Sequence, residues 1–280
     1  MRLGEIEFHI LNDGTFRLDG GAMFGVIPKP MWERAIPADE KNRITLSMNS
    51  LLIRAEGKWI LVETGAGDKW DAKRREIYAF DAAPRLPDQL AAHGLAPEQI
   101  DIVVNTHLHF DHCGWNTRIV NGAAVPTFPN ARYYVHLGEF EHARHPTERD
   151  RASYFPENFE PMVKTGQWHL VEGQGGEVVP GVELVVLPGH TSNMMGVRLF
   201  SGNQNAIFLA DLVPTTAHLP LPWIMGFDLY PMTTLEEKRK WLPRIAGESW
   251  LALFCHDRAV PAARLREADG KIVAEAVVVD

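Results

Sequence analysis

Short apolar runs bounded by turn residues recur along the chain, and they predict more strands than helices. Asp13-Gly14 separates two of these runs and predicts a tight hairpin, and Glu56-Gly57 predicts a second hairpin. The ranges that we expect to form strands are 5–12, 15–18, 44–55, 58–63, 102–104, 131–136, 167–171, 182–187, 194–200, 205–210, 251–254 and 271–278. Because strands fall in both halves of the chain, we expect two sheets.

Longer stretches with helical spacing lie between and after these runs, which favours helices outside the sheets. We expect helices near 69–80, 86–93 and 137–144, and an irregular helix over 149–165 that Pro156 interrupts. Thr233 and Thr234 stand three residues before Glu236 and Glu237, which is capping-box spacing. Another helix therefore begins there, and Pro243 kinks or ends it.

The chain has 280 residues, enough to bury a substantial core, and no repeat or low-complexity linker divides it. We therefore expect a single domain over residues 1–280. Residues 20–42 are rich in Gly, Pro, Met and aromatic side chains and predict a long loop with one helical turn. We interpret residues 1–43 as an N-terminal extension that covers an active site or forms an interface.

Composition and charge narrow the class of protein. Apolar residues make up 45% of the chain and charged residues 23%, which is typical of a globular protein. The net charge of -8 and the absence of a basic stripe argue against nucleic acid and anionic membranes as partners. No apolar run approaches the ~20 residues that a membrane span needs. Two cysteines make no disulfide framework, and no signal peptide is evident, so we expect a cytoplasmic protein.

The segment Thr106-His107-Leu108-His109-Phe110-Asp111-His112 concentrates metal-binding side chains directly after a buried strand. In an extended segment, His107 and His109 point the same way, so both can reach one ion. Asp111 and His112 lie past the turn and can reach a second ion. Imidazole and carboxylate groups suit zinc, iron, cobalt, nickel or manganese. The segment therefore predicts a metal site.

One segment cannot complete such a site, and three residues elsewhere are placed to join it. His190, Asp211 and His256 each follow an apolar run that predicts a strand, so we expect all three to be ligands. Cys113 and Cys255 adjoin predicted ligands. We interpret both cysteines as packing residues, because seven ligands already satisfy two ions.

These motifs resemble those of the metallo-β-lactamase superfamily. His-x-His-x-Asp-His matches residues 107–112, and Gly-His-Thr matches 189–191. The family's Asp-Thr-Gly strand end is Glu63-Thr64-Gly65 here, with glutamate in place of aspartate. The resemblance covers residues 44–257. It implies an α/β (α+β) fold, an αββα sandwich of two mixed sheets flanked by helices, with the metals at one edge between the sheets.

The resemblance also implies a role for each ligand. His107, His109 and His190 bind a first metal, Asp111, His112 and His256 bind a second, and Asp211 bridges the two. We expect two divalent ions, zinc first, with iron, manganese, cobalt or nickel as alternatives. Two such cations lower the pKa of a shared water, so that hydroxide attacks the substrate near neutral pH. We expect Asp111 and Asp211 to be catalytic, Asp111 by orienting the hydroxide or carrying its proton.

The complete ligand set favours the lactonase branch of this superfamily, because Cys255-His256-Asp257 resembles the Gly-His-Asp of that branch. We therefore expect a hydrolase that opens a lactone or cleaves an ester, phosphotriesters included, of a small hydrophobic substrate. Those lactonases have a tyrosine three residues after the bridging aspartate, where this chain has Pro214. His218 is a candidate to replace that tyrosine, and Tyr230 is a weaker one.

Four residues on or near the loops that we expect to surround the metals are predicted to contact the substrate: Phe24, Trp115, His218 and Trp223. An apolar pocket favours a small neutral substrate. The resemblance also implies a homodimer, with the aromatic N-terminal segment as its interface. Two alternatives stay open: a thioesterase like glyoxalase II, since residues 258–271 carry scattered basic side chains, and a metal-binding scaffold without catalysis.

Overall fold

The N-terminal part of the chain builds one large mixed sheet in this computed structural model, which describes residues 1–81 and 85–278. Its strands follow the order β1 (Arg2–Leu3), β2 (Ile6–Asp19), β3 (Arg43–Ala55), β4 (Lys58–Val62), β5 (Ile102–Val104), β8 (Arg132–His136) and β9 (Trp168–Val171). Neighbours from β1 to β4 are antiparallel, and neighbours from β4 to β9 are parallel.

The C-terminal part builds a second mixed sheet. Its strands follow chain order: β10 (Gly175–Val179), β11 (Val182–Val186), β12 (Met195–Ser201), β13 (Gln204–Phe208), β14 (Leu251–Leu253), β15 (Ala262–Ala268) and β16 (Lys271–Ala276). Only β13 and β14 are parallel neighbours among these described strands. A small ribbon pairs β6 (Thr117–Val120) with β7 (Ala123–Pro126).

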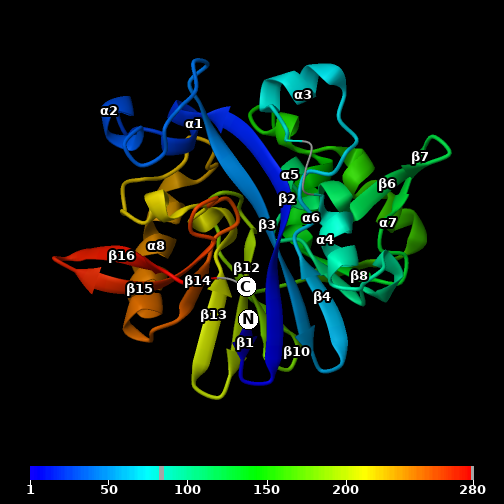
Figure 1. Cartoon of the computed structure of the whole chain (residues 1–280). Coiled ribbons are helices and arrows are strands. Elements are labelled where there is room, and N and C mark those ends of the chain that lie inside the picture. The colour runs from blue at the N-terminus through cyan, green and yellow to red at the C-terminus, as the bar shows by residue number, and fades with distance from the viewer. Residues whose placement is uncertain (82–84, 279–280) are drawn as a thin grey trace.

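Helices lie outside the two sheets (Figure 1). The α-helices are α1 (Gly20–Phe24), α2 (Lys29–Trp32), α3 (Ala72–Tyr78), α4 (Leu86–Ala92), α5 (Phe110–Cys113), α6 (Leu137–Arg144), α7 (Glu160–Thr165) and α8 (Pro231–Gly247). Short 3-10 turns occupy η1 (Pro97–Gln99), η2 (Gly114–Asn116), η3 (Arg151–Ser153), η4 (Pro156–Asn158), η5 (Ala210–Leu212) and η6 (Thr216–His218). In Figure 1, α8 lies on one side of the molecule and α4, α6 and α7 lie on the other.

Side chains that point in turn to the two faces of the central strands explain why one sheet packs against the other sheet on one face and against helices on the other. On β3, Leu51 and Ile53 pack in the core cluster that contains the second sheet, whereas Leu52 packs with Leu90 of α4 and Phe140 of α6. Successive side chains of a strand point to opposite faces, so the stretch 51–53, which is apolar at three successive positions, is covered on both faces. The predicted architecture of two mixed sheets flanked by helices is confirmed.

The predicted hairpin at Asp13-Gly14 is wrong. β2 continues through both residues and pairs with β3 from Glu7 to Asp19, with a register shift between Asn12 and Thr15. Gly14 has φ 91°, so the turn-like dipeptide forms a bulge and not a chain reversal. Bulges and hairpin turns both favour Asp-Gly, and the local sequence does not separate them.

The predicted start of the last helix is also wrong. α8 begins at Pro231, and the hydroxyl of Thr234 donates to Asp228 Oδ2 (2.7 Å) instead of capping the helix. Pro243 lies inside α8, which continues to Gly247. The strands β1, β6, β7, β10 and β15 have no counterpart in the predicted set. The hairpin across Glu56-Gly57 is confirmed.

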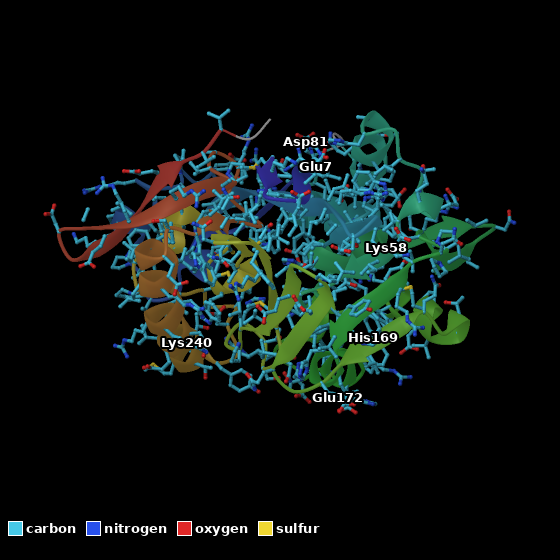
Figure 2. All side chains as sticks on the ribbon, turned by 90° about the horizontal axis from the view of Figure 1, so that it is seen from below. Glu7, Lys58, Asp81, His169, Glu172 and Lys240 are labelled. Carbon is cyan, nitrogen blue, oxygen red and sulfur yellow. The ribbon has the colours of Figure 1, made fainter. Side chains whose placement is uncertain are left out.

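Charged side chains of both signs are spread over the face seen in Figure 2, where Glu7, Lys58, Glu172 and Lys240 are labelled and exposed. Every helix among the described residues is too short or too polar to span a lipid bilayer.

Candidate metal centre

Four strand ends or strand connections deliver polar side chains to one edge of the two sheets. The segment after β5 carries residues 105–112, and the segment after β13 carries Asp211. His256 follows β14, and His190 lies between β11 and β12. Because β13 and β14 are parallel neighbours, Asp211 and His256 emerge side by side. The sheets are joined at this edge by the hydrogen bond from Met195 N to Thr106 O (2.9 Å).

The first group of predicted ligands surrounds one oxygen of Asp211. His190 Nε2 lies 3.2 Å from Asp211 Oδ2 and 3.0 Å from His109 Nδ1. His107 Nε2 lies 3.9 Å from the same oxygen. The ligand atoms of His107, His109 and His190 all lie within 4.8 Å of one another.

The second group lies beside the first and shares Asp211 with it. His112 Nε2 and His256 Nε2 are 3.3 Å apart, and Asp111 Oδ2 lies 3.6 Å and 3.5 Å from them. Asp211 Oδ1 lies 3.2 Å from His256 Nε2. The structure thus brings all seven predicted ligands together, and each is buried.

Three of these imidazoles face a hydrogen-bond acceptor outside the ligand groups, and that acceptor fixes the tautomer of each ring. His112 Nδ1 faces Glu63 Oε2 at 3.1 Å, His190 Nδ1 faces Asp228 Oδ1 at 3.0 Å, and His256 Nδ1 faces Ser47 O at 2.8 Å. Carboxylate and carbonyl oxygens only accept, so each Nδ1 carries the hydrogen and each neutral ring leaves a lone pair on Nε2. The Nε2 lone pairs of His112 and His256 therefore face each other across 3.3 Å.

This donor set fits divalent metal ions. Facing lone pairs beside two carboxylates repel one another unless a cation lies among them. Without a metal that cation is a proton, because, although burial opposes it, the Asp111 and Glu63 carboxylates raise the pKa of His112 well above its usual range. A metal ion that binds here replaces this proton. His107 Nε2 is buried without a hydrogen-bond partner, which is costly unless the nitrogen binds something. Burial, and then the neighbouring imidazoles, hold the pKa values of His107 and His109 well below the usual range. Both rings are therefore neutral near pH 7, which is the form that binds metals.

Two positioning residues were not predicted to take part. Glu63 drew notice only as a departure from a family motif, yet Oε2 faces His112 and Oε1 accepts from Thr106 N (2.8 Å). Its backbone has φ 65°, an uncommon conformation for a residue with a side chain. Asp228 is buried between His190 and Thr234, but nothing in its local sequence distinguishes it from an ordinary turn aspartate.

Replacing Glu63 with glutamine is expected to weaken metal binding about 10- to 100-fold. The introduced amide would keep an acceptor for Thr106 N but present an N–H₂ group to His112 Nδ1, which favours the tautomer protonated at Nε2. Competition with a fluorescent chelator measures the metal affinity. The exposed Glu40→Gln serves as the matched control, and equal affinities for the two variants would contradict the prediction.

A cavity of about 490 Å³ lies directly over the predicted ligands. His109, Asp111, His190, Asp211 and His256 form part of its wall. Apolar side chains supply most of the rest: Leu18, Ala22, Met23, Phe110, Ala152, Met225, Phe227 and Leu229. Its other polar side chains among the described residues are Tyr78, Arg149, Asp150 and Ser153. Small-molecule sites are commonly lined in this way.

The four residues predicted to contact the substrate lie outside the lining of this cavity. Phe24 is fully buried and stacks on His218, with ring centroids 4.6 Å apart, and Trp223 packs edge-on against Phe24. His218 Nε2 bonds to Met23 O (2.9 Å), so its ring supports the cavity wall from behind. Trp115 is buried in the core, where Nε1 donates to Asp13 Oδ1 (2.7 Å).

The two cysteines lie beside predicted ligands and are both buried. Cys113 Sγ donates to the carbonyl oxygens of Leu108 and His109, at 3.3 Å and 3.2 Å. Cys255 Sγ donates to Asp211 Oδ1 at 3.1 Å. The ligand atoms of Cys255, Asp211 and His256 lie within 4.8 Å of one another, so Cys255 is near enough to the predicted ligands to contact a bound metal.

Comparison with known proteins places the chain in a family. The model of the metallo-beta-lactamase superfamily matches residues 44–256. An N-acyl homoserine lactonase, AiiB of Agrobacterium fabrum, is 27% identical over 251 residues, which cover 84% of this chain and 88% of that protein. An N-acyl homoserine lactonase of Bacillus cereus is 35% identical over 178 residues, covering 60% and 64% of the two chains.

Solved structures agree with this relationship. A probable metal-dependent hydrolase from Staphylococcus aureus superposes with a TM-score of 0.90 at 30% identity, over 100% of both chains. The hydrolase AbOPH superposes with a TM-score of 0.80 at 22% identity, over 100% of this chain and 97% of that one, and so shows the shared fold. The chain therefore belongs to the metallo-beta-lactamase superfamily and is a metal-dependent hydrolase of that family.

Proposed function

We propose that this hydrolase opens lactones or cleaves carboxylic esters of small, largely apolar molecules, using two divalent cations. One observation carries the proposal: the Nε2 atoms of His112, His190 and His256, whose rings are oriented through Nδ1, converge with Asp211 at the floor of a largely apolar cavity. Relatives over most of the chain are named N-acyl homoserine lactonases, which supports a lactone as the substrate.

The two cations would be held by the two groups of side chains described above. His107, His109 and His190 would hold one cation, Asp111, His112 and His256 would hold the other, and Asp211 has an oxygen toward each group. Zinc suits this set of imidazoles and carboxylates best, and iron, manganese, cobalt and nickel also suit it. When bound, such a pair lowers the pKa of a water and polarises an ester carbonyl.

The side chains of the chain itself would orient the reactants. Asp111 lines the cavity, and its Oδ2 lies between the imidazoles of His112 and His256, so it can hold the attacking water and accept a proton from it. The apolar wall, with Phe110 and Met225, would bind the body of the substrate and exclude bulk water.

The alternative of a thioesterase with a basic binding region finds less support. Arg264 and Arg266 lie on β15, where they bond to Ser249 O and Glu275, and neither lines the cavity. Arg258 and Lys271 are exposed and do not line it either. A glutathione group bound over the cavity would meet Arg149 as its one described basic residue.

Chelation of the purified protein is expected to abolish ester and lactone hydrolysis, and readdition of zinc to restore it. The assay covers lactones, aryl esters, phosphotriesters and thioesters, paired with metal analysis of the untreated protein. Two metals per chain with turnover of lactones or esters would support the proposal. Turnover of thioesters alone would favour the thioesterase, and bound metal without any turnover would favour a scaffold.

A further inference from the structure

Three cavity-lining side chains outside the predicted ligand set can donate a hydrogen bond: Tyr78, Arg149 and Ser153. Arg149 is exposed at the rim, where it donates to Gly226 O (2.7 Å). Tyr78 differs from the other two because its ring packs on Phe110, with centroids 4.8 Å apart, and Phe110 directly precedes Asp111. The Tyr78 hydroxyl makes no hydrogen bond with any residue that the structure describes.

The end of α3 holds Tyr78 firmly in this position. The guanidinium of Arg43 donates to the carbonyl oxygens of Glu76 and Ile77, at 3.1 Å and 3.0 Å, and Asp39 in turn accepts from Arg43. Ala79 follows with φ 45° and ends the helix. Figure 1 shows α3 at the same end of the molecule as α1, beyond the upper end of β2.

Aromatic packing fixes the ring itself. Trp70 and Phe80 pack against Tyr78, with centroids at 5.8 Å and 5.6 Å, and both also contact Phe110. Rings held on several sides lose little further freedom when a substrate binds, so a donor on such a ring is organised in advance. The phenol therefore offers an unused O–H group at a fixed place in the cavity.

The charge state of Tyr78 suits a donor. Burial, and then the Asp111 carboxylate, raise the pKa of the phenol above its ordinary value of 10.0. The hydroxyl therefore keeps its proton at neutral pH.

Ester hydrolysis has a step that needs such a donor. When the bond from the carbonyl carbon to the leaving oxygen breaks, its electron pair stays on that oxygen. An alkoxide leaving group of a lactone is a strong base, so a neutral donor nearby lowers the barrier more than it does for an acidic phenol leaving group. One hydrogen of the attacking water finally neutralises the leaving oxygen, so a hydrogen-bonding residue keeps its own proton.

We propose that Tyr78 is a catalytic residue, whose O–H donates a hydrogen bond to the leaving oxygen as its bond to the carbonyl carbon breaks. This inference rests on the proposed ester and lactone hydrolysis. Tyr78 thereby takes the role for which His218 was the candidate, that of the tyrosine expected three residues after Asp211. His218 lies behind the cavity wall, and its ring nitrogens contact Thr215 and Met23.

The test compares Tyr78→Phe with wild type on esters and lactones that share an acyl group and differ in the acidity of the leaving alcohol. We expect kcat of Y78F to fall about 10- to 100-fold for alkyl leaving groups. The loss should be several-fold smaller for nitrophenyl esters, with KM within twofold and metal content and Tm unchanged. Tyr230→Phe, at an exposed tyrosine outside the cavity lining, should match wild type throughout.

A Y78F variant with wild-type kcat on alkyl lactones would overturn the inference, and so would an equal loss across all leaving groups. Either result leaves the proposed hydrolase function intact, because wild type still turns over. Absence of turnover by wild type on every ester and lactone would overturn both proposals together.

Discussion

Replacing Asp211 with asparagine is expected to reduce kcat/KM for any ester substrate by at least about 10³-fold, equivalent to ~4 kcal/mol of transition-state stabilisation. The metal content should fall from the proposed two ions per chain to at most one. Asp211 is the one predicted ligand with an oxygen toward each group, at 3.2 Å from His190 Nε2 and 3.2 Å from His256 Nε2.

The physical reason lies in the amide group. Asparagine has the shape of aspartate, but it lacks the negative charge that two adjacent cations require and has a single oxygen. Its N–H₂ group would also donate to an imidazole lone pair and occupy the place of a ligand atom. Elemental analysis and kinetics on the same preparation measure both effects.

Asp68→Asn is the matched control, because Asp68 is exposed and lies outside the cavity lining. It should keep both metals and wild-type kinetics. A D211N protein that retains two tightly bound metals and activity within tenfold of wild type would contradict the assignment of Asp211 to both groups.

Replacing Asp13 with asparagine is expected to lower the free energy of unfolding by about 3–6 kcal/mol. Asp13 is fully buried in the bulge of β2, and its carboxylate accepts four hydrogen bonds. Oδ1 accepts from Leu86 N and Trp115 Nε1, both at 2.7 Å, and Oδ2 accepts from Ala66 N at 3.1 Å and Gly67 N at 3.2 Å.

An asparagine amide turns one of these oxygens into a donor that faces two other donors. Two hydrogen bonds to the carboxylate are lost whichever way the amide is oriented, at ~1.5–3 kcal/mol each for a charged acceptor. Burial raises the pKa of Asp13 to about 7, so unfolding is measured at a pH well above that value, where the carboxylate is ionised. Thermal unfolding should show a Tm lower by roughly 10 °C, taking ~2–4 °C per kcal/mol for a chain of this size.

The matched control is Asp71→Asn at the exposed N-cap of α3, where Asp71 Oδ1 accepts from Arg74 N (2.7 Å). Asparagine caps helices as well as aspartate, so this variant should unfold at the wild-type temperature. A D13N protein as stable as D71N would show that the four contacts contribute little to stability.

Much of the fold and the candidate site was readable from the sequence because its signals are local. The run Ile102–Val104 is apolar at every position, which indicates a strand covered on both faces. The motif over residues 107–112 places four side chains with metal-binding chemistry within one strand end and one helical turn. His190, Asp211 and His256 each follow an apolar run, and such positions meet at one edge once the strands pair.

Predictions from the sequence were wrong where one local pattern is compatible with two different structures. Asp13-Gly14 favours a turn and a bulge equally, and only pairing of β2 with the full length of β3 decides between them. Aromatic loop residues suit a binding site and a buried support equally. The stacking of Phe24 between Trp32 and His218 depends on the approach of residues 20–36 to residues 218–226, which no local pattern encodes.

The sequence by itself determined which side chains can bind metal and which segments are strands, because both follow from residue type and short spacing. Only the tertiary structure decided that Glu63, Asp228 and the Ser47 carbonyl orient three of the imidazoles, and that Tyr78 faces the same cavity. Those contacts join residues far apart in the chain. They exist because hydrophobic burial packs the two sheets together, and that burial is not directional enough to specify individual partners in advance.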